Sequence, residues 1–277
     1  MELVNVQTVL FEQNRIESFY LKRTVLVDFY LPKNITNPNE LSLLLINDGQ
    51  DLEKMPFLPM IDELHITNKI VPLLCVGIHA GKERRMEYGT ASVLDYEGRG
   101  AKALAYNKFI LKELLPFIKD TYRVQSFKQK AFAGFSLGGL TAIDMVWHHP
   151  QLFSIAGVFS GSLWWRSRGL DDGYDEDTDR IMHALIRKGR NYPGLKFFFA
   201  TGSLDEKMDR NGNGIIDSID DTLGLIEELE KVGYEPQKDI EYINFEDGRH
   251  DVPTWARAMP LFLEWGWGVS KFKGKNI

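Results

Sequence analysis

Short apolar runs alternate with amphipathic segments along most of the chain. The apolar runs lie at residues 24–31, 41–46, 70–78, 129–133, 155–159, 195–201 and 239–245. Several are continuously apolar, which is typical of parallel strands covered on both faces. Helical spacing lies between them, at residues 55–66, 101–121, 137–149, 179–189, 220–232 and 253–265. The alternation predicts an α/β fold, with a mostly parallel central sheet and helices on both faces.

The N-terminal part has a different pattern. Residues 16–31 are typical of a β-hairpin or a pair of extended strands that ends at Pro32. Since antiparallel strands are common at the edge of a parallel sheet, we expect antiparallel N-terminal strands here. The irregular segments 161–177 and 204–220 do not resemble domain linkers, and we predict a single domain over residues 1–277.

Composition narrows the classes of protein. With 277 residues, 44% of them hydrophobic, the chain can bury a large core without disulfides. Its one cysteine, Cys75, lies in an apolar run and is predicted to be a small buried hydrophobe. The net charge of −6 and the lack of a long basic stretch argue against nucleic acid or an anionic membrane as a partner. No leader-like or membrane-spanning run is visible, so we expect no membrane partner and a cytoplasmic location.

The first chemical motif is Gly134-Phe135-Ser136-Leu137-Gly138, between the predicted strand 129–133 and the predicted helix 137–149. In a strand–turn–helix setting, Gly-x-Ser-x-Gly forms the nucleophile elbow of the α/β-hydrolase fold. The glycines leave room for a sharp turn that lifts the serine hydroxyl above the sheet. There the backbone N–H of Leu137 can stabilise an oxyanion. A simple Gly-Ser turn into a helix is the alternative, and Ser136 is the predicted nucleophile.

A serine nucleophile needs a base and an acid, which follow it in the order Asp or Glu, then His. His250 lies between the predicted strand 239–245 and the last predicted helix, which indicates the base. A solvated loop histidine is the alternative. Asp205 follows the strand 195–201, at the sheet edge where catalytic groups gather, and is the predicted acid. Glu206 and Asp209 are close in sequence, so the choice of acid stays open.

Other candidate contacts follow neighbouring predicted strands. The backbone N–H of Gln50, in the turn after strand 41–46, is the candidate second oxyanion donor, with an ordinary turn as the alternative. Trp164 and Trp165 follow strand 155–159 and predict an aromatic wall for an acyl or aryl substrate, unless they only pack a lid. Arg85 and Tyr88 follow strand 70–78 and are predicted to bind a polar or anionic substrate group, with a structural ion pair as the alternative.

Residues 209–220 match a Ca²⁺-binding loop, with oxygen ligands at positions 1, 3, 5 and 9 and glycine at position 6. The predicted ligands are Asp209, Asn211, Asn213, the carbonyl of Ile215, Asp217 and Asp220. Aspartate at position 12, in place of the EF-hand glutamate, is similar to a dockerin-type loop. A structural Ca²⁺ would hold the loop that carries the acid. A metal-free turn that caps the next helix is the alternative.

Several motifs together resemble one family. They are Asn47-Asp48-Gly49-Gln50, Arg85-Met86-Glu87-Tyr88, Glu113-Leu114-Leu115-Pro116-Phe117-Ile118 with Tyr122-Arg123, Gly134-Phe135-Ser136-Leu137-Gly138-Gly139, and Gly202 with Asp205. From about residue 24 to residue 267 the chain resembles the putative esterase family. This family includes esterase D-like enzymes, enterochelin-esterase-type siderophore hydrolases, feruloyl esterases and the antigen 85 acyltransferases. The resemblance implies a hydrolase with a Ser136, Asp205 and His250 triad and no cofactor for catalysis.

Three functions are consistent with these residues. The first is a serine esterase that cleaves a small-molecule carboxylic ester through an acyl-enzyme intermediate. The second is an acyltransferase with the same triad, in which an alcohol replaces water. The third is a calcium-binding module without catalysis, which the filled triad positions disfavour. Three tryptophans near the C-terminus are expected to pack internally or at a homodimer interface; they are Trp255, Trp265 and Trp267.

Overall fold

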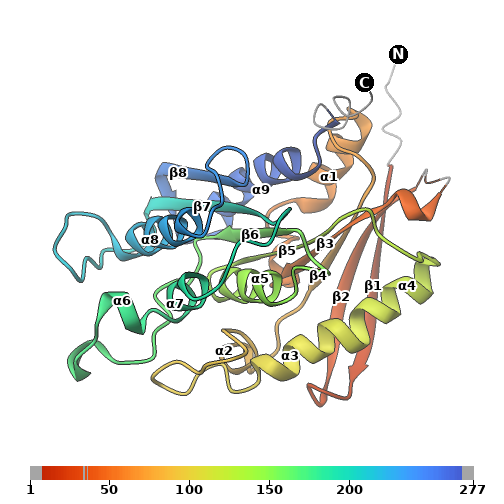
Figure 1. Cartoon of the computed structure of the whole chain (residues 1–277). Coiled ribbons are helices and arrows are strands. Elements are labelled where there is room, and N and C mark those ends of the chain that lie inside the picture. The colour runs from red at the N-terminus through yellow and green to blue at the C-terminus, as the bar shows by residue number, and fades with distance from the viewer. Residues whose placement is uncertain (1–7, 34, 36, 270–277) are drawn as a thin grey trace.

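The computed structural model describes residues 8–33, 35 and 37–269. Its centre is an eight-stranded sheet in the order β1-β2-β4-β3-β5-β6-β7-β8 (Figure 1). The strands are β1 (Val9–Ser18), β2 (Arg23–Pro32), β3 (Ser42–Asn47), β4 (Leu73–Ile78), β5 (Lys130–Phe135), β6 (Ile155–Phe159), β7 (Lys196–Leu204) and β8 (Ile240–Arg249). Strands β3 to β8 are parallel, whereas β1 and β2 are antiparallel. The predicted mixed α/β sheet is therefore confirmed.

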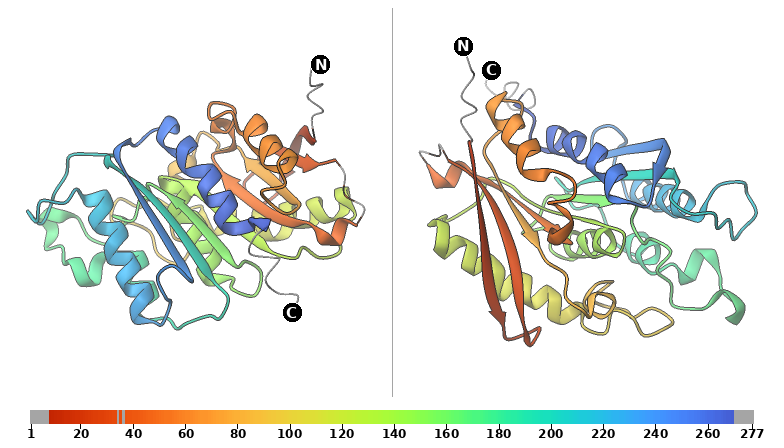
Figure 2. Two further views of the ribbon diagram at one scale, coloured as in Figure 1. Left: turned by 90° about the horizontal axis from the view of Figure 1, so that it is seen from above. Right: turned by 180° about the vertical axis from the view of Figure 1, so that it is seen from behind.

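Helices cover both faces of this sheet (Figure 2). One face carries α1 (Phe57–Ile66) and α9 (Val252–Trp267). The other carries α3 (Ala103–Phe109), η3 (Ile110–Leu114), α4 (Leu115–Tyr122), α5 (Leu137–His148), α7 (Ile181–Arg187) and α8 (Asp217–Lys231). Alternate residues of β3 contribute to the two cores, with Leu43 and Leu45 on one side and Leu44 and Ile46 on the other. This is why the strand sequence is continuously apolar.

Short helical turns lie in the connections. They are η1 (Pro38–Glu40), η2 (Gly49–Asp51), α2 (Arg84–Glu87), η4 (Leu170–Asp172) and α6 (Glu176–Asp179). The predicted helix 101–121 is interrupted by the π-helical segment η3, which ends two residues before Pro116 in the first turn of α4. Proline has no N–H for the i→i−4 ladder and clashes with the preceding turn, and a π-bulge accommodates such a residue.

The ends of two strands differ from the sequence prediction in a way that positions the site. Strand β7 extends to Leu204 and β8 extends to Arg249, so Asp205 and His250 each directly follow a strand. The first strand begins at Val9, earlier than the predicted hairpin. Cys75 is fully buried, as predicted. Within the described residues, none of the helices is both long and apolar enough to pass through a bilayer.

Candidate active site

Ser136 occupies the turn between β5 and α5, with φ 54° and ψ −122°. A positive φ is strained for a residue with a Cβ, and such strain is typical of functional turns. The turn closes because glycines flank it: a Cβ on Gly134 would lie 2.4 Å from the carbonyl carbon and oxygen of Gly138. The Ser136 N–H donates to the carbonyl of Phe159 at 2.9 Å, which ties the elbow to β6. The sequence motif therefore forms an elbow that places a half-buried serine at the N-terminus of a helix, on the wall of a cavity.

The three predicted triad residues share one cavity of about 460 Å³. Its walls come from the carboxyl ends of the parallel strands and from the loops after β4 and β6. The lining residues are Arg84, Arg85, Arg99, Ser136, Leu137, Ser160, Gly161, Ser162, Trp164, Asp205, Glu206, Ser218 and His250. The cavity thus brings together a serine hydroxyl, an imidazole and a pair of neighbouring carboxylates from three segments that lie far apart in the sequence.

Among the described residues, no hydrogen bond joins Ser136, His250 and Asp205 to one another. The Ser136 hydroxyl lies 3.2 Å from the Ser162 hydroxyl, and both oxygens of the Asp205 carboxylate are buried without a hydrogen-bond partner. Catalytic hydrogen bonds are often long in a ligand-free site and shorten when substrate binds. Ser162 was missed from the sequence, since only its place after β6 brings it to the elbow.

Burial shifts the ionisation of both titratable partners. Desolvation lowers the pKa of His250, and the neighbouring Asp205 carboxylate opposes that shift. Desolvation raises the pKa of Asp205, which the Ser160 hydroxyl and His250 oppose. A lowered histidine pKa favours the neutral imidazole, which is the form that can accept a proton from a serine hydroxyl.

The loop after β3 packs directly on the elbow. Asn47 is fully buried, donates its amide N–H to the carbonyl of Gly138 at 2.8 Å and accepts a hydrogen bond from the hydroxyl of Tyr106. Asp48 has a left-handed backbone, with φ 58°, and its carboxylate is held by two N–H groups of Arg84, each at 2.7 Å. Such a forked contact between guanidinium and carboxylate fixes orientation as well as distance. The loop is therefore fixed against the nucleophile by buried polar contacts.

Gln50, the predicted oxyanion donor, lies in η2 at the end of this loop. Its side chain accepts a hydrogen bond from the Ala80 N–H at 3.0 Å, so the side chain is tied to the loop after β4. The preceding Gly49 packs so tightly that a Cβ there would lie 2.4 Å from the carbonyl carbon of Gly77. This close approach is the reason for glycine at that position.

The predicted substrate contacts divide into two groups. Arg85 and Trp164 line the cavity. Tyr88 and Trp165 do not: both are fully buried, and this corrects their assignment to the pocket. The Tyr88 hydroxyl accepts the N–H of Asp48 at 3.2 Å, and the Trp165 ring packs on Gly89, where an added Cβ would lie 2.6 Å from it. The rings of Trp164 and Trp165 lie 5.9 Å apart, yet only Trp164 reaches the wall of the cavity, a difference in burial that the sequence alone could not resolve.

The predicted Ca²⁺ loop has a compact internal arrangement. The Asp209 carboxylate accepts the N–H groups of Asn213 and Gly214, and the side-chain amides of Asn211 and Asn213 donate to Asp220. Hydrogen bonds therefore link position 5 of the loop to positions 1, 3 and 12, and position 3 to position 12. Across the described part of the chain, no group of three or more His, Cys, Asp or Glu side chains is arranged to hold a metal ion.

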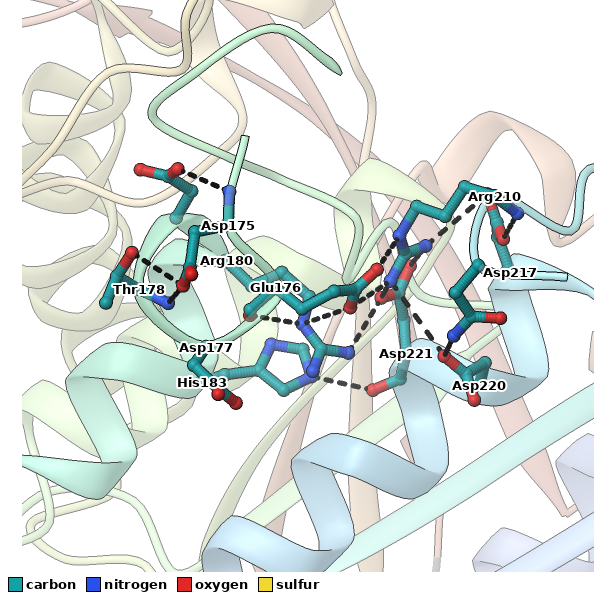
Figure 3. Close-up of polar contacts among 12 residues, drawn as sticks. Asp175, Glu176, Asp177, Thr178, Arg180, His183, Arg210, Asp217, Asp220 and Asp221 are labelled. Atoms are coloured by element: carbon teal, nitrogen blue, oxygen red, sulfur yellow. Dashed lines mark hydrogen bonds and ion pairs between the residues drawn. The ribbon is translucent and has the colours of Figure 1, made fainter. Parts of the chain in front are cut away.

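Arg210, at position 2 of the loop, takes part in a buried ionic network (Figure 3). Its guanidinium contacts Glu176 of α6 and Asp221 of α8, and lies 3.4 Å from Asp217. Arg180 adds a second contact to Asp221, at 3.1 Å. The Arg210 guanidinium thus joins the loop that follows Asp205 to both α6 and α8. The sequence does not predict this network, because its charged residues come from separate segments and form no recognisable motif.

Sequence comparison shows which family and which relative this chain is similar to. The family model Esterase, described as "Putative esterase", matches residues 18–264. Over 230 residues the chain is 23% identical to the Bacillus subtilis (strain 168) protein YjcH, which is described as uncharacterized; the match covers 82% of this chain and 84% of YjcH.

Two solved structures share the fold. The enterobactin esterase FES from Shigella flexneri superposes with a TM-score of 0.69 at 21% identity; the match covers 92% of this chain and 58% of that protein. An IroE-like serine hydrolase from Shewanella oneidensis superposes with a TM-score of 0.66 at 20% identity, covering 93% of this chain and 79% of the other. The chain therefore spans little more than half of the Shigella protein. Since the family model covers most of its length, the chain belongs to the putative esterase family and has the α/β-hydrolase fold of its esterase neighbours.

Proposed function

We propose that this protein is a serine hydrolase that cleaves a carboxylic ester through an acyl-enzyme intermediate. The observation that carries the proposal is the strained Ser136 on its elbow, in one cavity with His250 and Asp205. Family membership supports ester hydrolysis as the reaction. The adjacent carboxylate and imidazole are the groups that a serine nucleophile requires.

The reaction begins when the Ser136 hydroxyl attacks the ester carbonyl and His250 accepts its proton. Asp205 orients the imidazole and stabilises its charged form. The backbone N–H groups of Gln50 and Leu137 hold the oxyanion, and the alcohol leaves with a proton from His250. Water then attacks the acyl-enzyme, with His250 again as the base, and releases the acid.

Trapping the acyl group tests this mechanism. Rapid quenching during turnover of p-nitrophenyl acetate is expected to leave one acetyl group on the peptide that contains Ser136, detected by mass spectrometry. Acetylation at other residues only, or full turnover with no trapped acyl group under conditions that give a burst of p-nitrophenol, would contradict it. An added alcohol separates the two reactions: transfer of the acyl group to it in preference to water identifies an acyltransferase.

The cavity favours an ester with an anionic or aryl group. Arg85 lines it with an exposed guanidinium that forms no ion pair within the described residues. Arg99 stacks over the ring of Trp164 at 5.0 Å, which places a cation beside an aromatic wall. The Shigella neighbour is an enterobactin esterase, so enterobactin is one ester to include in a substrate panel.

Replacing Arg85 by methionine is expected to raise KM for a carboxylate-bearing aryl ester by about tenfold, because one charge-assisted contact is lost. KM for the matching neutral aryl ester should change by less than about twofold on the same grounds. Steady-state kinetics on the two esters checks this result. An equal rise for both substrates would show that Arg85 supports the fold of the pocket and does not recognise charge.

We also propose that the 209–220 loop binds Ca²⁺ as a structural ion. The Asp209 carboxylate accepts the backbone N–H of Asn213, the side chains of Asn211 and Asn213 contact Asp220, and carboxylate and amide oxygens suit this cation. At a hundredfold excess over Kd, Ca²⁺ should raise the melting temperature by about 5–10 °C relative to chelator. An Asp209→Ala variant should show no such difference. Identical melting curves of the unaltered protein in Ca²⁺ and in chelator would exclude the ion.

A further inference from the structure

Trp255, in the first turn of α9, contacts residues on both sides of the proposed catalytic pair. Its indole N–H donates to the Ser160 hydroxyl at 3.0 Å, in a buried hydrogen bond. Its ring meets the His250 ring edge to face, with centroids 5.4 Å apart and planes at 81°. The ring also stacks on Phe135 of the elbow strand, at 5.0 Å and 21°. One side chain therefore touches the base directly and reaches the end of β6 through its N–H.

Ser160 stands between Trp255 and the acid. It is 2% exposed, with φ 44°, and its N–H donates to the carbonyl of Ala200 at 2.7 Å. A buried serine at positive φ is costly and persists where the surrounding structure fixes it. Because its oxygen accepts the indole N–H, its own hydroxyl proton is left to point at another acceptor. Asp205 lines the same cavity as Ser160, and its buried carboxylate oxygens have no hydrogen-bond partner of their own.

We propose that Trp255 and Ser160 are positioning residues. Trp255 orients the Ser160 hydroxyl toward Asp205, and its ring packs against the ring of His250. The inference rests on the proposed function of Ser136, Asp205 and His250. It assigns to this tryptophan and this serine the task of aligning the acid with the base. Neither residue forms a hydrogen bond with the Ser136 hydroxyl, which lies beside Ser162.

The state of Asp205 explains why such alignment is needed. Both of its carboxylate oxygens are buried and accept no hydrogen bond, so the charged form lacks the donors that normally stabilise it. Ser160 is the foremost of the groups that lower the Asp205 pKa against the effect of burial. The Ser160 hydroxyl, in the same cavity, is therefore a donor available to this carboxylate.

Simple core packing is the competing explanation, and helix α9 contains a matched comparison for it. Trp267 is fully buried on the same helix and contacts Phe262 at 5.5 Å, but its indole N–H has no hydrogen-bond partner. Replacing either tryptophan by phenylalanine removes similar apolar volume. Only Trp255→Phe removes a donor that leads to Asp205.

The test compares Trp255→Phe, Ser160→Ala, the double variant and the control Trp267→Phe in the full chain. We expect kcat for p-nitrophenyl acetate to fall by about tenfold in each of the first two, with KM changed by less than about twofold, because a misaligned acid slows chemistry more than binding. The double variant should be no slower than the slower single variant, since both act through one hydrogen bond. Trp267→Phe should keep the unaltered kcat.

A second readout does not depend on turnover. The pKa of His250, followed by NMR of its ring proton and assigned with His250→Gln, is raised by the Asp205 carboxylate and lowered by burial. We expect a lower His250 pKa in Trp255→Phe and Ser160→Ala, because Asp205 no longer faces the imidazole, and no shift in Trp267→Phe. The other ionisable groups that act on this pair are Arg84, Glu206, Tyr242 and Asp251. They are unchanged in all variants.

The outcomes separate the two proposals. An unchanged kcat and an unchanged His250 pKa in folded Trp255→Phe and Ser160→Ala would overturn the positioning roles while Ser136 remains the nucleophile. Fully multiplicative losses in the double variant would also overturn them. If Trp255→Phe does not fold, Ser160→Ala decides the question alone. A trapped acyl group on a residue other than Ser136 would instead refute the proposed function.

Discussion

Replacement of Ser136 by alanine is expected to reduce kcat for ester hydrolysis by about 10⁴-fold or more, as losing the nucleophile does in other serine hydrolases. The residual rate would come from substrate binding and the oxyanion donors, which the variant retains. Substrate affinity should hardly change, because the removed hydroxyl lies at the reacting centre and contributes little to ground-state binding. Steady-state kinetics with p-nitrophenyl acetate measures the loss.

An exposed serine supplies the control. Ser126 lies in the connection before β5, outside the lining of the catalytic cavity, and Ser126→Ala should retain full activity. A Ser136→Ala protein that hydrolyses the ester at the unaltered rate would remove the basis of the proposed function. Melting curves of the two variants should be similar, so that a loss of activity cannot be assigned to unfolding.

Gly134→Ala is expected to destabilise the protein by about 3 kcal/mol and to abolish hydrolysis, because the added methyl group overpacks the elbow. The new Cβ would lie 2.4 Å from backbone atoms of Gly138, which cannot rotate away as a side chain can. The elbow would have to open, and that would move Ser136 away from His250. Urea denaturation gives the loss of stability, and ester kinetics gives the loss of activity.

Gly266→Ala is the matched control in helix α9. The nearest atom to its added Cβ is a methyl group of Ile155 at 3.6 Å, an ordinary van der Waals distance. Alanine has the higher helix propensity, so this variant should be neutral or more stable by up to about 1 kcal/mol. Equal stability of Gly134→Ala and Gly266→Ala would show that the elbow is more plastic than its contacts indicate.

Most of the fold could be predicted from the sequence because its signals are local. Continuous apolar runs require cover on both faces, which a parallel sheet between helices provides. The helix at residues 101–121 was predicted without its π-helical interruption, although Pro116 was visible. The helix continues across the proline because its apolar face, which includes Tyr106, Ile110 and Leu114, is buried against the sheet. Tertiary packing here outweighed the local penalty.

For the candidate site, the sequence predicted the elbow at Ser136 better than the residues that surround it. Ser136 was identified because Gly-x-Ser-x-Gly needs only a strand before it and a helix after it. Asp205 and His250 were chosen because strand ends of a parallel sheet meet at one edge. Tyr88 and Trp165 were placed in the pocket wrongly, because composition does not say which side of an irregular loop is buried. Ser160 and Ser162 gave no signal of their own.

By itself, the sequence determined the strand–helix alternation and the elbow at Ser136, since each depends on residues close together in the chain. It also predicted Asp205 and His250 as partners of Ser136, because each follows a strand of its own. Only the tertiary structure decided which distant side chains surround the elbow. The hydrogen bond from Trp255 to Ser160 joins residues 95 positions apart, and it exists because α9 packs against one face of the sheet over β6. Contacts of that kind depend on how layers pack, which no local pattern encodes.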